Sequence, residues 1–273
     1  MSRDRLTVAL IHEVFFGEDA DARLDDALKR AREGGAELAL LPELPLDHWA
    51  PATRTPNDDD AEPPDGPRHT RFAAAARRAG IGLLGGAITI DEGGVRRNRA
   101  LLVNAAGERV AEHDKLHVPL EEGFWEKDHY EPGKRLAPPC DAFGLRIGLQ
   151  ICSDMQRPAS VQALAAMGAE VVVAPRATPG SSYERWLTVL RAAAIAGCCY
   201  VVSTNRPRPE RGVPIGCPSV VIAPGGDVQV ETVETVTVAT LERAAVEAAR
   251  RDYPGYLDVR AALYADAWSS LAP

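Results

Sequence analysis

The sequence predicts an α/β protein, in which buried strands alternate with amphipathic helices, and three observations support this fold class. Short apolar runs bounded by glycine, such as Leu145–Ile151, are typical of buried strands. Segments such as Asp21–Arg32 carry apolar residues at helical spacing. The run GAELALLP at 35–42 is echoed by GAEVVVAP at 168–175, and each copy follows a predicted helix. One half of the chain therefore resembles the other, which predicts two βα layers around a shared core.

The first half of the chain contains most of the predicted strands. The expected strands are Leu6–Ile11, Ala36–Leu41, Ile81–Ile90, Arg99–Asn104 and Arg109–His113, and the expected helices are Asp21–Arg32 and Thr70–Ala79. Between them, Asp47–Pro67 is rich in Pro and Asp and has no periodicity. We expect a long loop there, where binding residues or a lid often lie. Its acidic run Asn57–Glu62 predicts a solvated loop, with contact to a cationic, polyamine-like substrate as the alternative.

The second half predicts a similar alternation. The expected strands are Leu145–Ile151, Val171–Ala174, Tyr200–Thr204, Ser219–Ile222, Val228–Val230 and Thr235–Thr240, and the expected helices are Ala159–Met167, Trp186–Ala196 and Leu241–Arg250. The last segment, Tyr253–Pro273, is expected to form an extended tail. No linker separates the two halves, so we expect a single domain over residues 1–273.

Composition excludes some classes of binding partner and favours one cellular compartment. The net charge of −8 argues against nucleic acid or an anionic membrane surface as a partner. No run of about 18 apolar residues and no basic start before an apolar stretch is present, so no membrane span or signal peptide is expected. Five cysteines without metal-ligand spacing favour the reducing cytoplasm. His113 and His117 lack an evident third ligand, so no metal site is expected.

Cys152 ends one of the predicted strands. Ser153 and Asp154 then lead into a helix that would start near Pro158, and proline is favoured at a first helical position. Cys152 would therefore lie on a sharp turn close to unpaired N–H groups, which stabilise a thiolate or an oxyanion. A cysteine considered alone is more often a small core residue.

Two further residues make Cys152 a candidate nucleophile. Glu43, Lys115 and Cys152 each follow a different predicted strand, and reactive groups in α/β proteins gather beyond the carboxyl ends of strands. A thiol with a pKa of about 8.5 needs a base and a positive neighbour to react near neutral pH. Glu43 could take its proton, and Lys115 could stabilise the negative charge that develops on the substrate.

The motifs around these residues resemble the Glu-Lys-Cys triad of the nitrilase superfamily of carbon–nitrogen hydrolases. The triad segments are LLPELPL with Glu43, HDKLHVP with Lys115 and GLQICSD with Cys152. Four other segments resemble the family in the same order, namely Arg97-Asn98, Arg191–Arg206, Gly216–Gly226 and Val259–Tyr264. The resemblance thus covers nearly the whole chain.

The resemblance implies a fold and a mechanism. The fold would be an αββα sandwich of two mixed sheets flanked by helices, assembled as a homodimer or larger homo-oligomer. Cys152 would attack the carbon of a C–N bond with Glu43 as general base. Lys115 and the backbone N–H of Ser153 would hold the tetrahedral oxyanion, and water would then hydrolyse a thioester. Neither a metal nor an organic cofactor would be needed.

One segment points to a branch of the family. The run KLHVPLEEGFWEKDHYEPG at 115–133 resembles the linear amidases and N-carbamoyl amine hydrolases. The resemblance places Glu126 at a second carboxylate that positions the substrate, with Glu121 and Glu122 as nearby competitors. Where those branches carry an aromatic residue after the cysteine and a later Pro-Glu pair, this chain has Ser153 and Pro158-Ala159.

Four more residues are candidates for substrate binding. His117 lies beside Lys115, and Trp125 lies in the same run as Glu126. Arg176 follows the echoed strand and could pair with a substrate carboxylate or with a nearby acidic residue. Tyr183 begins the segment before the helix at Trp186–Ala196.

The expected function is hydrolysis of a small linear amide or N-carbamoyl amine with release of ammonia. A nitrilase acting on a nitrile is the alternative within the same chemistry, and the second carboxylate argues against it. An acyltransferase that shares the thioester step is also open. From a different class, the chain could be a catalytically inactive binding protein with the same fold, and the altered residues after Cys152 motivate that alternative.

Overall fold

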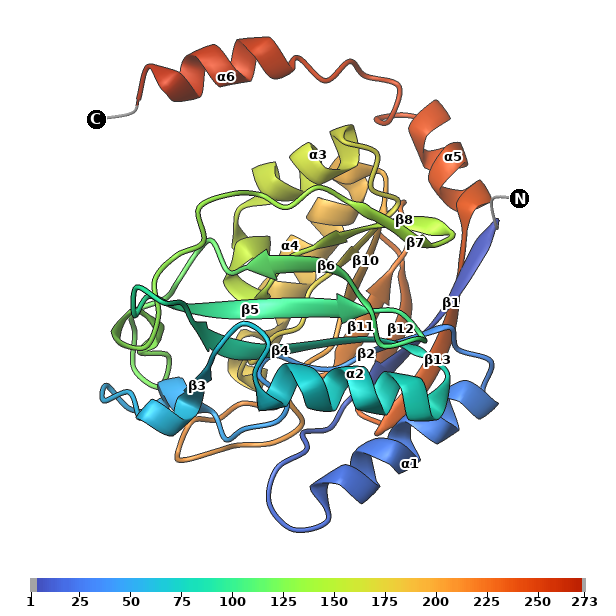
Figure 1. The fold of residues 1–273 in the computed structure, drawn as a ribbon. Helices are drawn as coiled ribbons and strands as arrows, with labels where there is room; N and C mark the ends of the chain where they lie inside the picture. Colours follow the sequence, from blue (N-terminus) through green and yellow to red (C-terminus); the bar gives the residue numbers. More distant parts are fainter. Residues whose placement is uncertain (1–3, 272–273) are drawn as a thin grey trace.

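Two β-sheets packed face to face form the centre of the molecule, and helices cover their outer faces (Figure 1). The computed structural model describes residues 4–271. One sheet has seven strands and the other has six, and both are mixed, with parallel and antiparallel pairs. The predicted αββα sandwich is therefore confirmed.

The seven-stranded sheet has the order β13-β1-β2-β4-β5-β6, with β3 paired to β4. Its strands are β1 (Arg5–Ile11), β2 (Leu38–Leu40), β3 (Ala61–Glu62), β4 (Gly82–Ile90), β5 (Arg96–Val103), β6 (Arg109–Asp114) and β13 (Val236–Glu242). Helices α1 (Ala20–Glu33) and α2 (Pro67–Ala79) pack against each other and lie over its outer face (Figure 1).

The six-stranded sheet has the order β12-β11-β10-β9-β8-β7. Its strands are β7 (Cys140–Phe143), β8 (Leu145–Leu149), β9 (Val171–Val173), β10 (Tyr200–Ser203), β11 (Ser219–Ile222) and β12 (Val228–Thr232). Helices α3 (Pro158–Ala166) and α4 (Tyr183–Gly197) cover its outer face, and α5 (Arg243–Arg251) follows β13.

The strands are apolar on both faces because both faces of each sheet are covered. In β1, Leu6, Val8 and Leu10 point into the core shared by the two sheets, whereas Ala9 and Ile11 pack beneath α1 and α2. Successive side chains of a strand point to opposite faces, so a strand covered on both sides needs a continuous apolar run.

The echoed segments occupy equivalent places in the two sheets. β2 lies between β1 and β4 in parallel with both, and β9 lies between β8 and β10 in parallel with both. The glutamates that precede them also correspond, because Glu37 accepts a bond from the amide of Thr7 and Glu170 from that of Arg146. The internal repeat is thus a repeat of structure.

Three features differ from the prediction. The short edge strand β7 was not expected, because none of its residues is buried and its burial pattern does not alternate. The loop at 47–67 contains β3, which adds to the edge of β4. The segment from Tyr253 is not simply extended, since it forms α6 (Ala261–Ser269), which Figure 1 shows reaching away from the body; the last two residues of that prediction lie outside the described chain.

Membrane insertion through a helix finds no support in the described part of the chain. Within residues 4–271, no helix combines the length and the apolar character required to cross a bilayer.

Candidate active site

The candidate catalytic residues come from the carboxyl ends of three strands. Glu43 lies three residues beyond β2, and the ladder continues past that strand because the amide of Leu41 donates to Leu84 O at 3.0 Å. Lys115 directly follows β6, and its amide donates to Asn98 O at 2.9 Å. Cys152 follows β8 and opens a short 3₁₀ helix at Cys152–Gln156.

A buried cluster of charges joins the first two strands. The ammonium of Lys115 donates to Glu43 Oε1 at 2.8 Å and also to Glu126 Oε2. All three side chains are at most 1% exposed. Oε2 of Glu43 and Oε1 of Glu126 are buried and have no hydrogen-bond partner within residues 4–271. One cation therefore links two carboxylates, and each carboxylate keeps one oxygen for another group.

Two neutral side chains fix the orientation of this cluster. The amide nitrogen Nδ2 of Asn98 donates to Glu43 Oε1 at 2.8 Å and to the hydroxyl of Tyr130 at 3.1 Å. That hydroxyl donates in turn to Glu126 Oε2. Both residues are buried. Buried polar groups that are satisfied in this way hold one arrangement and resist repacking.

The charges in this cluster shift each other's ionisation. Burial alone would lower the pKa of the Lys115 ammonium, but the carboxylates of Glu126 and Glu43 outweigh it and raise that pKa above its ordinary range. Burial raises the pKa of Glu126 to about 7; Lys115 opposes this change and Glu43 adds to it. Lys115 is therefore charged at all working pH values, whereas Glu126 titrates near neutrality.

Cys152 lies on a strained turn beside this cluster. Its backbone is left-handed, with φ 44°, and its amide donates to Pro175 O at 2.9 Å. The sequence predicted that nearby N–H groups would favour the thiolate. A backbone hydrogen bond from Ala177 does lower the pKa of the Cys152 thiol, as expected. Burial and the charge of Glu43 nevertheless raise that pKa overall, and Lys115 offsets them only in part. The thiol is protonated at rest and must lose its proton during the reaction.

A cavity of about 360 Å³ opens beside Cys152. Cys152 and Glu126 both line it, whereas Glu43 and Lys115 are buried and lie outside the lining. Its other lining residues are a mixture of apolar and polar side chains: Pro119, Glu121, Phe124, Ser153, Gln156, Ala177, Thr178, Pro179, Ser182, Arg185 and Trp186. The volume suits a small molecule with few heavy atoms.

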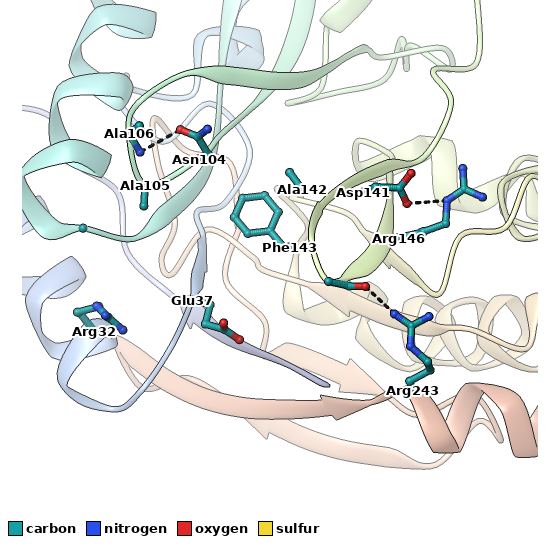
Figure 2. Close-up of a pocket in the computed structure, with 12 residues that line it drawn as sticks. Arg32, Glu37, Asn104, Ala105, Ala106, Asp141, Ala142, Phe143, Arg146 and Arg243 are labelled. Atoms are coloured by element: carbon teal, nitrogen blue, oxygen red, sulfur yellow. Dashed lines mark hydrogen bonds and ion pairs between the residues drawn. The ribbon is translucent and has the colours of Figure 1, made fainter. Parts of the chain in front are cut away.

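A larger pocket, of about 900 Å³, lies at the opposite ends of the strands (Figure 2). Its residues Glu37 and Gly144 directly precede β2 and β8, and Phe143 lies at its centre. None of the four candidate catalytic residues lines it. Size therefore does not locate the chemistry, because reactive groups of α/β proteins gather at the carboxyl ends of the strands.

The competitors of Glu126 lie in different surroundings. Glu121 lines the cavity with an exposed side chain, and Glu122 is exposed. Neither contacts Lys115 within the described chain, whereas Glu126 does. Of the three glutamates, only Glu126 both contacts Lys115 and lines the cavity within the described chain.

The four predicted substrate-binding residues lie outside the lining of the cavity. The ring of His117 contacts Asp154, and Trp125 stacks under the guanidinium of Arg54 at 3.7 Å. Tyr183 is half-buried at the start of α4. Arg176 is buried, and internal groups use its guanidinium: Ser203, Thr178, Cys217 and the carbonyl of Pro218.

Sequence reasoning missed three residues that the structure brings to the site. Asn98 and Tyr130 appeared only as parts of motifs, and Asp154 only as a residue that leads into a predicted helix. The sequence pattern gives no signal for Asn98, because it lies among Arg96, Arg97 and Arg99 and outside the predicted strand Arg99–Asn104. Tyr130 lies four residues beyond Glu126, but the 3₁₀ turn at Glu126–Asp128 that brings them together has no clear sequence signature.

Comparison with known proteins is consistent with this geometry. The family model described as carbon–nitrogen hydrolase matches residues 19–251. The chain belongs to that family. The resemblance to the nitrilase superfamily drawn from the triad motifs is thereby confirmed.

Individual relatives match nearly the whole length of the chain. Omega-amidase NIT2 of Mus musculus is 26% identical over 275 residues, which cover 97% of this chain and 98% of that protein. A carbon–nitrogen hydrolase from Helicobacter pylori G27 has the same fold, with a TM-score of 0.84, 21% identity and coverage of 97% and 98%.

A third relative carries a covalent adduct. It is a mutant of the amidase from Nesterenkonia sp. AN1, which shows covalent addition of the acetamide moiety of fluoroacetamide at its active-site cysteine. It matches with a TM-score of 0.77, 27% identity and coverage of 96% of this chain and 97% of that one.

Proposed function

We propose that this carbon–nitrogen hydrolase cleaves a small linear amide or N-carbamoyl amine through a thioester on Cys152. The observation that carries the proposal is the single cavity into which Cys152 and Glu126 open, backed by Lys115 and Glu43. A nucleophile with a base beside it and a cation that can stabilise an oxyanion suit acyl transfer from nitrogen. The named amidases among the relatives support the same substrate class.

The first half of the proposed reaction forms the thioester. Glu43 takes the proton of the Cys152 thiol as the sulfur attacks the carbonyl carbon, which accounts for a thiol that is protonated at rest. The oxygen of the tetrahedral intermediate is held by the Lys115 ammonium and the backbone N–H of Ser153. The amide of Cys152 already donates to Pro175 O, so Ser153 provides the next N–H along the chain.

The second half releases the products. Glu43 passes the proton to the leaving nitrogen, the C–N bond breaks, and ammonia departs. Water then attacks the acyl-enzyme, with Glu43 again as base, and frees the thiol. An amide yields a carboxylic acid, whereas an N-carbamoyl amine yields a carbamic acid that loses CO₂ to give the amine. Lys115 keeps its charge throughout, because two carboxylates raise its pKa.

Glu126 is proposed to orient the substrate. Its oxygen Oε1 is unpartnered and its side chain lines the cavity, so it can accept a hydrogen bond from the substrate NH₂ group. A nitrile has no N–H to offer, so this carboxylate favours an amide over a nitrile.

The test is to trap the acyl adduct by intact mass, with a panel of small amides and ureido acids and with a matched amide and nitrile. We expect an adduct on Cys152 and ammonia release from an amide or ureido substrate, both lost in Cys152→Ala. Cys140→Ala is the control, since Cys140 is a free and partly exposed thiol away from the cavity. Undiminished turnover in Cys152→Ala would refute the proposal. Added amine nucleophiles would reveal acyl transfer.

We also propose that residues 1–273 form one carbon–nitrogen hydrolase domain that assembles as a homo-oligomer in the cytoplasm. All five cysteines are unpaired, which supports a reducing compartment. Helix α6 has no buried residue, and Leu263 and Trp268 are 58% and 66% exposed. So short a helix is marginal without packing, which supports a second copy as its partner. Light scattering of Leu263→Glu/Trp268→Glu should show a smaller assembly, and an unchanged mass would contradict this role.

A further inference from the structure

A fully buried carboxylate, Asp154, links two of the segments that carry catalytic groups. Its Oδ1 accepts bonds from the amides of Leu116 at 2.9 Å and His117 at 2.8 Å, and from His117 Nδ1 at 3.1 Å. Its Oδ2 accepts bonds from His113 Nε2 at 2.9 Å and from the amide of Ile151 at 3.1 Å. The side chain is 0% exposed.

These partners lie on either side of the proposed catalytic residues. His113, Leu116 and His117 surround Lys115 in the chain, whereas Ile151 immediately precedes Cys152. The hydroxyl of Ser153 adds a second link, because it donates to the carbonyl of His117. The backbone of Lys115 is therefore tied to the backbone of Cys152 through one side chain and its neighbour.

The link depends on a carboxylate. Backbone amides donate to both oxygens, those of Leu116 and His117 to Oδ1 and that of Ile151 to Oδ2. The side chain must therefore accept on both oxygens, which an ionised carboxylate does and an amide cannot. Burial alone would raise the pKa of Asp154, but the bonds from His113 and His117 outweigh it and hold that pKa well below its usual range. The carboxylate thus keeps its charge at every pH where the protein would work.

We propose that Asp154 is a positioning residue, which fixes the distance between the Lys115 ammonium and the Cys152 sulfur. This proposal rests on the proposed function, because the distance between Lys115 and Cys152 affects turnover only if the two residues act together in catalysis. Asp154 does not line the cavity, so it acts through Lys115 and Cys152 and not on the substrate. Misplacement of a catalytic group by about 1 Å reduces turnover by about 10²-fold.

A second buried carboxylate offers a matched control. Glu170 is also buried, accepts a bond from the amide of Arg146 at 2.9 Å and pairs with Arg243. It precedes β9 at the opposite end of the strands from Cys152. Loss of its charge removes a comparable structural contact and leaves the proposed site alone.

The experiment compares Asp154→Asn with Glu170→Gln. In Asp154→Asn the new NH₂ group faces N–H donors and cannot accept their hydrogen bonds. Either the segment around Lys115 or the segment around Cys152 therefore loses its link. We expect kcat to fall by about 10²-fold with a KM change of a few-fold at most, and Glu170→Gln to keep kcat within about threefold. The alkylation rate of Cys152 by iodoacetamide, followed by peptide mass mapping, should fall about tenfold in Asp154→Asn, because a more distant Lys115 no longer lowers the thiol pKa.

Two results would overturn the proposal: wild-type kcat in a folded Asp154→Asn, or an equal loss of kcat in both variants. If Asp154→Asn does not fold, His117→Ala takes its place, since that side chain is partly exposed and makes one of the five contacts. It should lose kcat and alkylation rate by about fivefold, and wild-type values would again refute the role. If the wild-type protein cleaves no amide, the proposed function fails, and the alkylation rates still decide the role of Asp154.

Discussion

The two ends of the strands carry similar residue types in different surroundings. At the carboxyl ends, Lys115 is buried between Glu43 and Glu126, and each carboxylate retains an unpartnered oxygen. At the amino ends, Arg146 pairs with Asp141 at 2.9 Å, with side chains 42% and 72% exposed (Figure 2). Both side chains of that second pair are thus largely open to solvent.

The difference shows which end can do chemistry. Exposed pairs contribute about 0–1 kcal/mol and do not perturb ionisation much, because water screens them. Buried charges act at short range in a medium of low dielectric and shift each other's proton affinity. The smaller cavity, which adjoins the buried charges, is therefore the candidate site, although the pocket at the amino ends is larger.

The largest expected effect comes from Lys115→Met. It leaves two buried carboxylates without a cation, so we expect a loss of about 3–5 kcal/mol in the free energy of unfolding. Turnover should fall by at least about 10³-fold, because the oxyanion loses its charged donor. Urea denaturation and ammonia release measure the two effects. A folded variant with near-normal turnover would contradict the view that the buried charges at the carboxyl ends of the strands take part in the reaction.

A smaller effect is expected from Glu126→Gln, and it depends on pH. Since the pKa of Glu126 rises from 4.5 to about 7 on folding, the folded state binds that proton more tightly. The resulting stabilisation is present below pH 4.5 and is lost as pH rises to about 7; a shift of this size corresponds to about 3 kcal/mol. Relative to the wild type, Glu126→Gln should therefore be more stable at pH 8 than at pH 5, as measured by urea unfolding.

The same substitution should separate reactivity from turnover. The charge of Glu126 raises the pKa of the Cys152 thiol, so its removal lowers that pKa and speeds alkylation at pH 8. Turnover should nevertheless fall by about 10²-fold, because the substrate loses an orienting group. Parallel changes in the two rates would argue against an orienting role.

The smallest effect is expected from Arg146→Met at the amino ends of the strands. It carries the same new side chain as Lys115→Met but breaks an exposed pair. The free energy of unfolding should change by less than about 1 kcal/mol and turnover by less than about twofold. Loss of turnover comparable with that of Lys115→Met would mean that the two ends are coupled.

The strands and helices of the sandwich could be predicted from the sequence because their apolar patterns are local. β1, β4 and α1 agree with the prediction to within one residue, since each strand or helix buries a regular face. Edge strand β7 and helix α6 lack that signal. β7 is half-exposed, and α6 is exposed all round.

The site could be predicted only in part, for a physical reason. Glu43, Lys115 and Cys152 follow strand ends, which topology brings together. The contacts that hold them depend on irregular backbone beyond the strands. Asp154, which follows a strand of one sheet, accepts bonds from the amides of Leu116 and His117, which follow a strand of the other. The upward shift of the thiol pKa could not be predicted, because burial and a neighbouring carboxylate are properties of the assembled cavity.

The left-handed backbone at Cys152 limits which nucleophiles this scaffold can carry. At a φ of 44°, a side chain branched at Cβ clashes with its own peptide groups, so threonine is disfavoured there. Serine has the same unbranched shape and can replace sulfur with oxygen without disturbing the turn. Exchange of sulfur for oxygen is therefore compatible with this turn, whereas a move to the threonine chemistry of other hydrolases would first require a different backbone.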